Sequence, residues 1–228
     1  QTATCRNDDE GPRRRVTISQ PFYMGVYEVT QAQWRGVMGT EPWKNRPRTK
    51  PDDNNAASYL SWNDASRFCA MLSKKTGRTI ALPTEAQWEY ACRAGDPADR
   101  FDDDVSKLGD YAWYRPNAYS AGQQYVHTVG RKKPNAFGLY DMRGNVWEWC
   151  RDWYRKDFYA EAKNVDPENT TVSKARVLRG GSWCNSAEYC RSAYRYNFEP
   201  SCRNYFPYGF RVVVSASPSQ AYDVRTQK

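Results

Sequence analysis

The sequence predicts a single α+β domain with few helices, short antiparallel strands and long irregular loops. The chain has 228 residues, which suits one domain of ordinary to large size, and no repeat or low-complexity linker divides it. Its nine Trp, 17 Tyr and eight Phe outnumber its two Ile, six Leu and 15 Val. A parallel sheet needs near-continuous runs of Val, Ile and Leu, and a coiled coil needs aliphatic heptads. Neither pattern is present, so aromatic side chains must build much of the core.

Three capping patterns predict helices. In each, a Ser or Thr is followed three residues later by a polar side chain that can bond back to its backbone N–H. A Gly near each predicted end supplies the left-handed residue that stops a helix. The three helices are predicted to begin after Thr30, Ser61 and Thr84 and to end near Gly39, Gly77 and Gly95.

Short runs rich in β-branched and aromatic residues predict strands. These runs are residues 16–18, 22–29, 79–82, 176–178 and 210–214. Between residues 96 and 175 the chain is rich in Asp, Gly, Pro, Asn and Tyr with little periodicity, and we expect irregular structure there. The polar ends predict a flexible N-terminal segment at 1–15 and a flexible C-terminal tail at 215–228, with one folded domain at 16–214.

The charge pattern argues against a nucleic-acid partner. The net charge is +8, but the basic runs are short, at residues 13–15, 46–50 and 131–133, and acidic residues lie between them. A nucleic-acid-binding protein gathers its positive charge on one element. No apolar stretch approaches the ~20 residues of a membrane-spanning helix, so no transmembrane segment is expected.

Seven Cys and a single His limit the chemistry that the chain can perform. Zinc sites built on His, and Ser-His-Asp or Cys-His catalytic groups, are very hard to assemble from one His. No Cys-x-x-Cys is present, and the odd number leaves at least one thiol unpaired within the chain. His127 lies in a Tyr-Val-His-Thr-Val alternation, which favours a strand residue over a functional one.

Six phrases of the sequence carry a resemblance to a known family. They are Phe22-Tyr23-Met24-Gly25-Val26-Tyr27-Glu28-Val29-Thr30, Leu82-Pro83-Thr84-Glu85-Ala86-Gln87-Trp88-Glu89-Tyr90, Pro134-Asn135-Ala136-Phe137-Gly138-Leu139-Tyr140-Asp141-Met142, Gly144-Asn145-Val146-Trp147-Glu148-Trp149, Arg179-Gly180-Gly181-Ser182-Trp183 and Gly209-Phe210-Arg211. In this order they resemble the formylglycine-generating enzyme, or sulfatase-modifying-factor, family from about residue 15 to about 214. The resemblance implies a C-type-lectin-like fold.

The same resemblance raises the question of catalysis. Enzymes of the family oxidise a substrate cysteine through a pair of cysteines that form a copper site, and Cu(I) prefers soft thiolate ligands. Cys190 matches the second of these cysteines, but Asn185 stands at the position of the first and Cys184 lies one residue early. We therefore expect no catalysis and no catalytic residue. A formylglycine-generating oxidase, in which Cys184 reaches the missing position on a loop, is the alternative.

Residues 184–208 have the composition of a binding surface. Asn, Tyr, Ser, Cys and Phe make up 16 of these 25 residues, and Lys, Leu, Ile, Val and Met are absent. Rigid aromatic residues mixed with small polar ones are typical of selected binding surfaces. The segment resembles the variable region of proteins diversified by a retroelement, the treponemal variable proteins among them, in which mutation of template adenines converts Asn codons to Tyr, Ser, Cys or Phe codons.

This resemblance implies a variable, ligand-binding region at 184–208 that faces solvent. The expected ligand-contacting residues are Cys184, Asn185, Ser186, Tyr189, Tyr194, Tyr196, Asn197, Phe198, Ser201, Cys202, Asn204, Tyr205, Phe206 and Tyr208. The alternative is that Tyr194, Tyr196 and Phe198, spaced by two, form one face of a core strand. The implied ligand is an unidentified protein or glycan, and the implied location is a cell surface, as a lipid-anchored outer-membrane protein. Cys5 is either a lipid-attachment site or a plain thiol.

Calcium is the one cofactor that the resemblance suggests, in a structural role. The matching positions are the Asp141 and Glu148 side chains and the carbonyls of Gly144 and Val146, and such hard oxygen ligands suit calcium. The alternative is that the two acids pair with arginines. A calcium-dependent sugar-binding lectin is a further functional alternative, but only Glu188 and Glu199 supply acids within 184–208.

Overall fold

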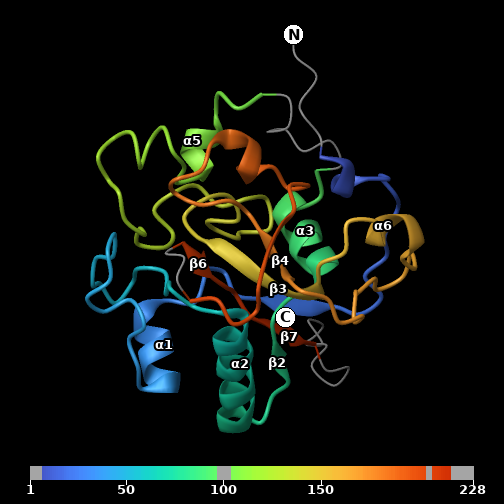
Figure 1. The fold of residues 1–228 in the computed structure, drawn as a ribbon, viewed down its shortest axis with the longest axis horizontal. Helices are drawn as coiled ribbons and strands as arrows, with labels where there is room; N and C mark the ends of the chain where they lie inside the picture. The colour runs from blue at the N-terminus through green and yellow to red at the C-terminus, as the bar shows by residue number, and fades with distance from the viewer. Residues whose placement is uncertain (1–6, 97–103, 204–206, 217–228) are drawn as a thin grey trace, which may run out of the picture.

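Two small sheets and a few helices make up the protein (Figure 1), and the predicted α+β class is confirmed. The computed structural model describes residues 7–96, 104–203 and 207–216. The larger sheet has the order β5-β4-β3-β6 and the smaller one the order β1-β7-β2. Both sheets bring together segments that lie far apart in the sequence.

The larger sheet is built around β3 (Trp147–Trp153). This strand runs antiparallel to β4 (Arg176–Arg179) and parallel to the short β6 (Tyr208–Gly209). β5 (Tyr196–Phe198) pairs with β4 and forms one edge of the sheet. The end of the predicted variable region, Tyr208, thereby lies beside Trp147 at the start of β3.

The smaller sheet joins the beginning and the end of the folded domain. β7 (Val213–Ser215) lies in its middle and pairs antiparallel with β1 (Phe22–Met24) on one side. On its other side it pairs antiparallel with β2 (Ile80–Ala81).

The three predicted helices are confirmed, and each begins where its cap is predicted. The side chains of Thr30, Ser61 and Thr84 accept a hydrogen bond from the backbone N–H three residues later. The helices are α1 (Gln31–Met38), α2 (Trp62–Thr76) and α3 (Glu85–Arg93). α1 and α2 pack together, and α3 packs against β3 and β4 (Figure 1). Shorter helical segments are η1 (Asp8–Glu10), α5 (Leu108–Tyr111), α6 (Phe158–Glu161) and η2 (Ala187–Cys190).

Aromatic rings take the place of aliphatic side chains in the main core. Trp34 and Phe68 stack with ring centroids 5.6 Å apart, and Phe210 meets Phe68 edge-on at 5.2 Å. All three are at most 2% exposed. Such pairs add roughly 0.5–1.5 kcal/mol beyond the burial of their area, which explains how a chain poor in Ile and Leu keeps a stable core.

Some of the predicted strands differ from the structure. Residues 16–18 form only a single bridge, from Thr17 to Val165, and 22–29 contributes only the three residues of β1. The stretch 96–175, which we predicted to be irregular, contains β3, the longest strand among the described residues. β3 is buried on both faces over most of its length, so its sequence lacks the alternation of polar and apolar residues that marks a half-buried strand.

Part of the predicted N-terminal segment is attached to the domain. Asp9 in η1 is only 7% exposed, and its backbone carbonyl accepts a hydrogen bond of 2.9 Å from Arg195. The Glu10 carboxylate binds the Arg191 guanidinium. Both arginines belong to the predicted variable region, so this segment supports it.

Candidate functional site

Three tyrosines of the predicted variable region gather around Trp147, and a phenylalanine lies beside one of them. The ring of Tyr196 stacks on that of Trp147 with centroids 5.0 Å apart, and the Tyr194 ring lies 6.0 Å away. Tyr189 meets Trp147 at a right angle, at 6.3 Å. Phe198 lies 6.5 Å from Tyr196 along the same strand. We call Tyr189, Tyr194, Tyr196 and Phe198 the aromatic surface.

The aromatic surface is half-buried rather than fully exposed or fully enclosed. Trp147 is only 3% exposed and forms its floor, whereas the four outer rings are each partly accessible to solvent. The Tyr189 and Tyr194 rings also contact each other, with centroids 4.7 Å apart. Each outer ring therefore has an inner contact that fixes its position and an outer part that remains available.

Buried arginines hold the backbone beneath this surface. The Arg195 guanidinium donates to both carboxylate oxygens of Glu85, at 2.8 and 2.9 Å. Arg179 donates to the Tyr194 carbonyl at 2.6 Å. Burial alone would raise the pKa of Glu85, but Arg195 and Arg179 outweigh it and hold that pKa below its ordinary value. Glu85 is therefore ionised at neutral pH and pins the variable region to α3.

Most of the predicted ligand-contacting residues are at least partly accessible to solvent. Ser201 is exposed, and the half-buried ones are Cys184, Asn185, Ser186, Tyr189, Tyr194, Tyr196, Asn197, Phe198 and Cys202. Asn204, Tyr205 and Phe206 lie outside the described residues.

Tyr208 corrects the prediction of a solvent-facing residue. It is only 1% exposed, because β6 pairs with β3 and directs its ring into the core. There it meets Trp149 edge-on, with ring centroids 5.4 Å apart. Tyr208 therefore belongs to the scaffold.

Asn185 supports the aromatic surface from below. Its side-chain oxygen accepts a hydrogen bond of 3.0 Å from the indole N–H of Trp147 and another from the Ser182 hydroxyl. These bonds fix the orientation of the Trp147 ring on which the tyrosines pack. The sequence did not predict this supporting role.

Burial raises the pKa of both thiols near the catalytic positions of the family, Cys190 at the second position and Cys184 one residue before the first. Cys190 is 1% exposed, packs against Leu108 and Ala112, and burial raises its pKa to about 12. Burial also raises the pKa of Cys184, which packs in a different cluster, beside Trp183. The two sulfurs are not bonded to each other. Without a bound metal, these raised pKa values keep both thiols mainly protonated at neutral pH.

Glu148, a predicted calcium ligand, already forms an ion pair with Arg211. Arg211 donates to both of its carboxylate oxygens, at 2.7 Å each, and the Trp88 indole donates to one of them at 2.8 Å. A guanidinium in this place supplies the positive charge that a metal would bring, so Glu148 does not fit as a calcium ligand here. Within the described ranges no group of three His, Cys, Asp or Glu side chains could hold a metal ion. Calcium binding stays an untested prediction.

Asp141 differs from Glu148 because one of its oxygens has no partner. Oδ2 accepts a hydrogen bond of 2.7 Å from the Gly130 N–H, while Oδ1 is buried and unbonded. Burial raises the pKa of Asp141 to about 6, against the lowering effects of the Gly130 N–H and Arg211. This carboxyl group therefore titrates near neutral pH.

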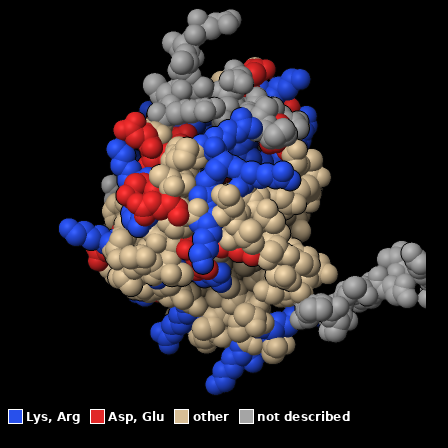
Figure 2. All heavy atoms as spheres, turned by 90° about the vertical axis from the view of Figure 1, so that its right-hand side faces the viewer, with Lys and Arg blue, Asp and Glu red and all other residues tan. Residues whose placement is uncertain are grey.

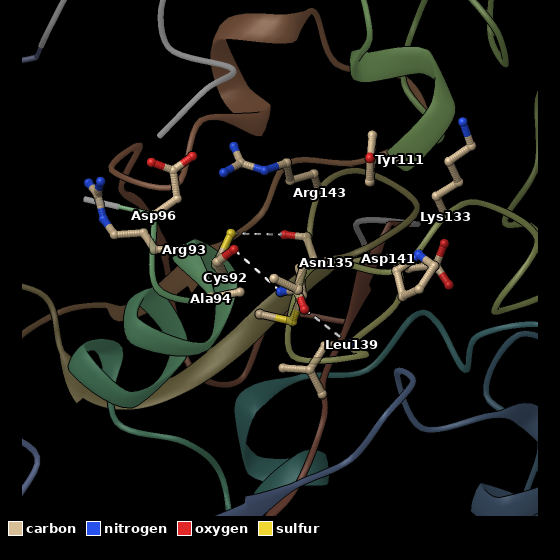
Figure 3. Close-up of a pocket in the computed structure, with 13 residues that line it drawn as sticks. Cys92, Arg93, Ala94, Asp96, Tyr111, Lys133, Asn135, Leu139, Asp141 and Arg143 are labelled. Atoms are coloured by element: carbon tan, nitrogen blue, oxygen red, sulfur yellow. Dashed lines mark hydrogen bonds between the residues drawn. The ribbon is translucent and has the colours of Figure 1, made fainter. Parts of the chain in front are cut away.

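A cavity of about 230 Å³ lies beside the end of α3 (Figure 3). Its charged lining residues include Arg93 and Lys133. Arg93 pairs with Glu89 at 2.9 Å, and Lys133 pairs with Asp110 at the same distance. Asp141, whose buried Oδ1 has no hydrogen-bond partner, also lines this cavity.

Charged side chains do not form one continuous basic surface on the face seen in Figure 2, where acidic residues interrupt the Lys and Arg side chains. No helix among the described residues has the length and apolar character needed to cross a membrane.

Comparisons with known proteins identify the family of the chain. Residues 1–216 match the family described as the sulfatase-modifying factor enzyme 1-like domain. The formylglycine-generating enzyme of Streptomyces coelicolor is 35% identical over 170 residues, which cover 69% of this chain and 52% of that enzyme. The chain thus spans about half the length of that relative.

Two solved structures are also similar. Treponema denticola variable protein 1 has a TM-score of 0.75 at 29% identity, over 86% of this chain and 84% of that protein. PvdO from Pseudomonas aeruginosa has a TM-score of 0.79 at 30% identity, over 92% of this chain and 87% of that protein. The comparisons confirm the resemblance and the fold class.

The raised pKa of Asp141 predicts how the unfolding free energy depends on pH. Its pKa in the folded protein, about 6, lies above the ~4 of an unfolded chain, so stability falls as pH rises through this interval. Asp141→Asn removes the charge, keeps an oxygen for Gly130, and tolerates the φ of 55°. Relative to the wild type, the variant should gain up to about 3 kcal/mol at pH 8 and little at pH 4.

Chemical denaturation of the two proteins at both pH values measures this gain. A difference in unfolding free energy that is the same at pH 4 and pH 8 would show that Asp141 is not the group responsible.

Proposed function

Because the chain belongs to the sulfatase-modifying factor enzyme 1-like family and presents a half-exposed aromatic surface, we propose that it is a non-catalytic ligand-binding protein. Its variable region, 184–208, would be diversified by a retroelement. The observation that carries the proposal is the packing of Tyr189, Tyr194 and Tyr196 around the buried Trp147, with Phe198 beside Tyr196. The similarity to the treponemal variable protein supports it.

The mechanism of binding is preorganisation. The Tyr196 and Tyr194 rings pack on Trp147, so they lose little conformational freedom when a ligand covers their outer parts. Tyrosine offers an apolar ring and a hydroxyl with only two side-chain torsions to fix, which suits both protein and glycan ligands. The half-buried Asn197 and the exposed Ser201 and Glu199 add hydrogen-bonding groups nearby in the chain.

The non-catalytic part of the proposal is supported by the sulfur chemistry. Asn185 stands at one position of the family's cysteine pair, where it hydrogen-bonds to Trp147, and an amide cannot replace a thiolate. Cys190 is buried, and its raised pKa keeps it protonated. The second candidate function is a formylglycine-generating oxidase, which the 35% identity to the Streptomyces coelicolor enzyme favours.

The proposed location rests on the resemblance alone. We propose that the protein is displayed at a cell surface by a lipid anchor, with an unidentified protein or glycan at a cell surface as its partner.

Gene comparison tests the proposed diversification. Among sibling isolates, substitutions should concentrate at half-exposed positions such as Tyr189, Tyr196 and Phe198. The buried supports Arg191 and Arg195 should stay constant, because each anchors a fixed ion pair. Substitutions spread evenly along the chain would end the proposal.

Diversification also requires that the scaffold tolerates change at the surface. Tyr196→Asn removes a half-buried ring that stacks on Trp147, so we expect a loss of about 1 kcal/mol of unfolding free energy. Tyr208→Asn is the matched control with the same chemical change in the core, and it should cost about 3 kcal/mol or more. Denaturant unfolding measures both, and equal losses would contradict the division into surface and scaffold.

An activity assay separates the two candidate functions. The protein is incubated with a sulfatase-type cysteine peptide, oxygen and copper, and mass spectrometry follows the peptide. We expect no formylglycine, because Asn185 stands at one of the two cysteine positions of the family. Conversion that disappears in the Cys190→Ser variant would establish the oxidase instead.

A further inference from the structure

Three rings and two lysines form a stacked column away from the aromatic surface. The imidazole of His127 lies parallel to the Trp113 ring, with centroids 4.0 Å apart, and the Tyr125 ring covers its other face at 5.0 Å. The Lys132 ammonium lies 4.1 Å from the centre of the Trp113 ring, and Lys50 lies 5.2 Å from that of Tyr125. The faces of the rings are thus occupied, and only their edges are available to a ligand.

A cavity of about 150 Å³ opens at the edge of this column. The rings of Trp113, Tyr125 and His127 line it, together with the charged side chains of Lys50 and Arg131. This cavity is large enough for several water molecules or for one small ligand.

Two nitrogens of the lining rings are buried without a hydrogen-bond partner. They are Nε1 of Trp113 and Nδ1 of His127, a residue that is only 5% exposed. Most buried polar groups in native proteins have a partner, and an indole N–H can only donate. The column therefore lacks at least one acceptor.

The charge around the cavity is positive. Lys50 and Arg131 are both exposed, and neither forms an ion pair with any residue in the part of the chain that the structure describes. Asp52 is the one carboxylate in the lining, and its Oδ1 accepts a hydrogen bond of 2.9 Å from the Asn54 N–H. An acceptor that also carries negative charge would satisfy both the indole N–H and the two cations.

We propose that this cavity binds a small oxyanion, the group shared by phosphates, sulfates and carboxylates. Trp113 Nε1 donates a hydrogen bond to the anion, and Lys50 and Arg131 neutralise its charge. His127 adds a second donor when it is protonated, because its Nε2 already lies 3.1 Å from the Gln123 oxygen and its Nδ1 is free. This site is separate from the aromatic surface and from the proposed function.

Binding of the anion and protonation of His127 should each stabilise the other. Burial, Lys132 and Lys50 lower the pKa of His127 to about 4, so the imidazole is neutral at pH 7 when the cavity holds no anion. An anion held beside it offsets the repulsion from both lysines, and Arg131 and Asp52 are the other charged residues that line the cavity. Anion binding should therefore raise the pKa of His127, and by reciprocity the affinity should increase as pH falls.

The chain's single histidine makes this linkage directly measurable. The imidazole C2–H signal in a proton NMR titration reports the pKa of His127 without interference from another histidine. Sodium sulfate, which stays ionised across the titration, is compared with sodium chloride at equal ionic strength. We expect sulfate to raise the pKa by about one unit or more and to shift one indole N–H signal, which Trp113→Phe removes and thereby assigns.

A pair of double variants distinguishes a site from general screening. Lys50→Gln with Arg131→Gln removes both exposed cations of the cavity and should weaken the sulfate response about tenfold. Lys74→Gln with Arg78→Gln makes the same change of charge at exposed positions outside the cavity lining and should leave the response unchanged. Inorganic phosphate and acetate, used in parallel, show whether tetrahedral or carboxylate anions are preferred.

Either of two results would overturn the proposal. If sulfate moves neither the His127 pKa nor the Trp113 signal, the cavity holds only water. If the two double variants lose the response equally, sulfate acts through general screening and no anion site exists here.

Discussion

The ion pair between Arg195 and Glu85 is the interaction on which the candidate binding surface depends. Both side chains are fully or almost fully buried, and the guanidinium also binds the Asp9 carbonyl. Three separate parts of the chain therefore meet at one charge pair: α3, the segment around η1 and the variable region. Removing one partner of such a pair typically costs 3–5 kcal/mol, because the other charge is left buried and alone. The backbone on which the tyrosines stand is thereby fixed by residues that point away from solvent.

A second buried pair does the same for the centre of the fold. Arg211, which follows the short strand β6, binds Glu148 in β3 and also donates to the Gly25 and Tyr140 carbonyls. Burial lowers the pKa of Arg211, but Glu148, Glu28 and Asp141 together raise it more, so the guanidinium stays charged. A guanidinium binds several oxygens in fixed directions, as a metal ion would. The arginine thus crosslinks segments that lie far apart in the chain, and the pairing of Glu148 with an arginine is the alternative to calcium that the sequence left open.

What the sequence could predict depends on how far apart the partners lie. Each capping box places its two hydrogen-bonding residues within one turn of helix, so four consecutive residues are enough to predict the starts of α1, α2 and α3. The burial of Tyr208 depends on pairing with the distant Trp147, and no local pattern shows it. The alternation around His127 predicts a strand residue, which is wrong: no strand of the described residues includes it, and its environment comes from rings and lysines elsewhere in the chain.

The aromatic richness of the chain has three physical uses, and position decides among them. Trp34 and Phe210 are enclosed on all sides and stabilise the core. The Tyr196 ring stacks on the buried Trp147 ring and is itself only half-buried, so part of it remains available for recognition. His127 and its neighbours are covered on their faces and offer only their edges, which suits hydrogen bonding rather than stacking. A ring therefore becomes a binding element when the scaffold fixes one part of it and leaves another part unsatisfied, and composition alone does not distinguish these cases.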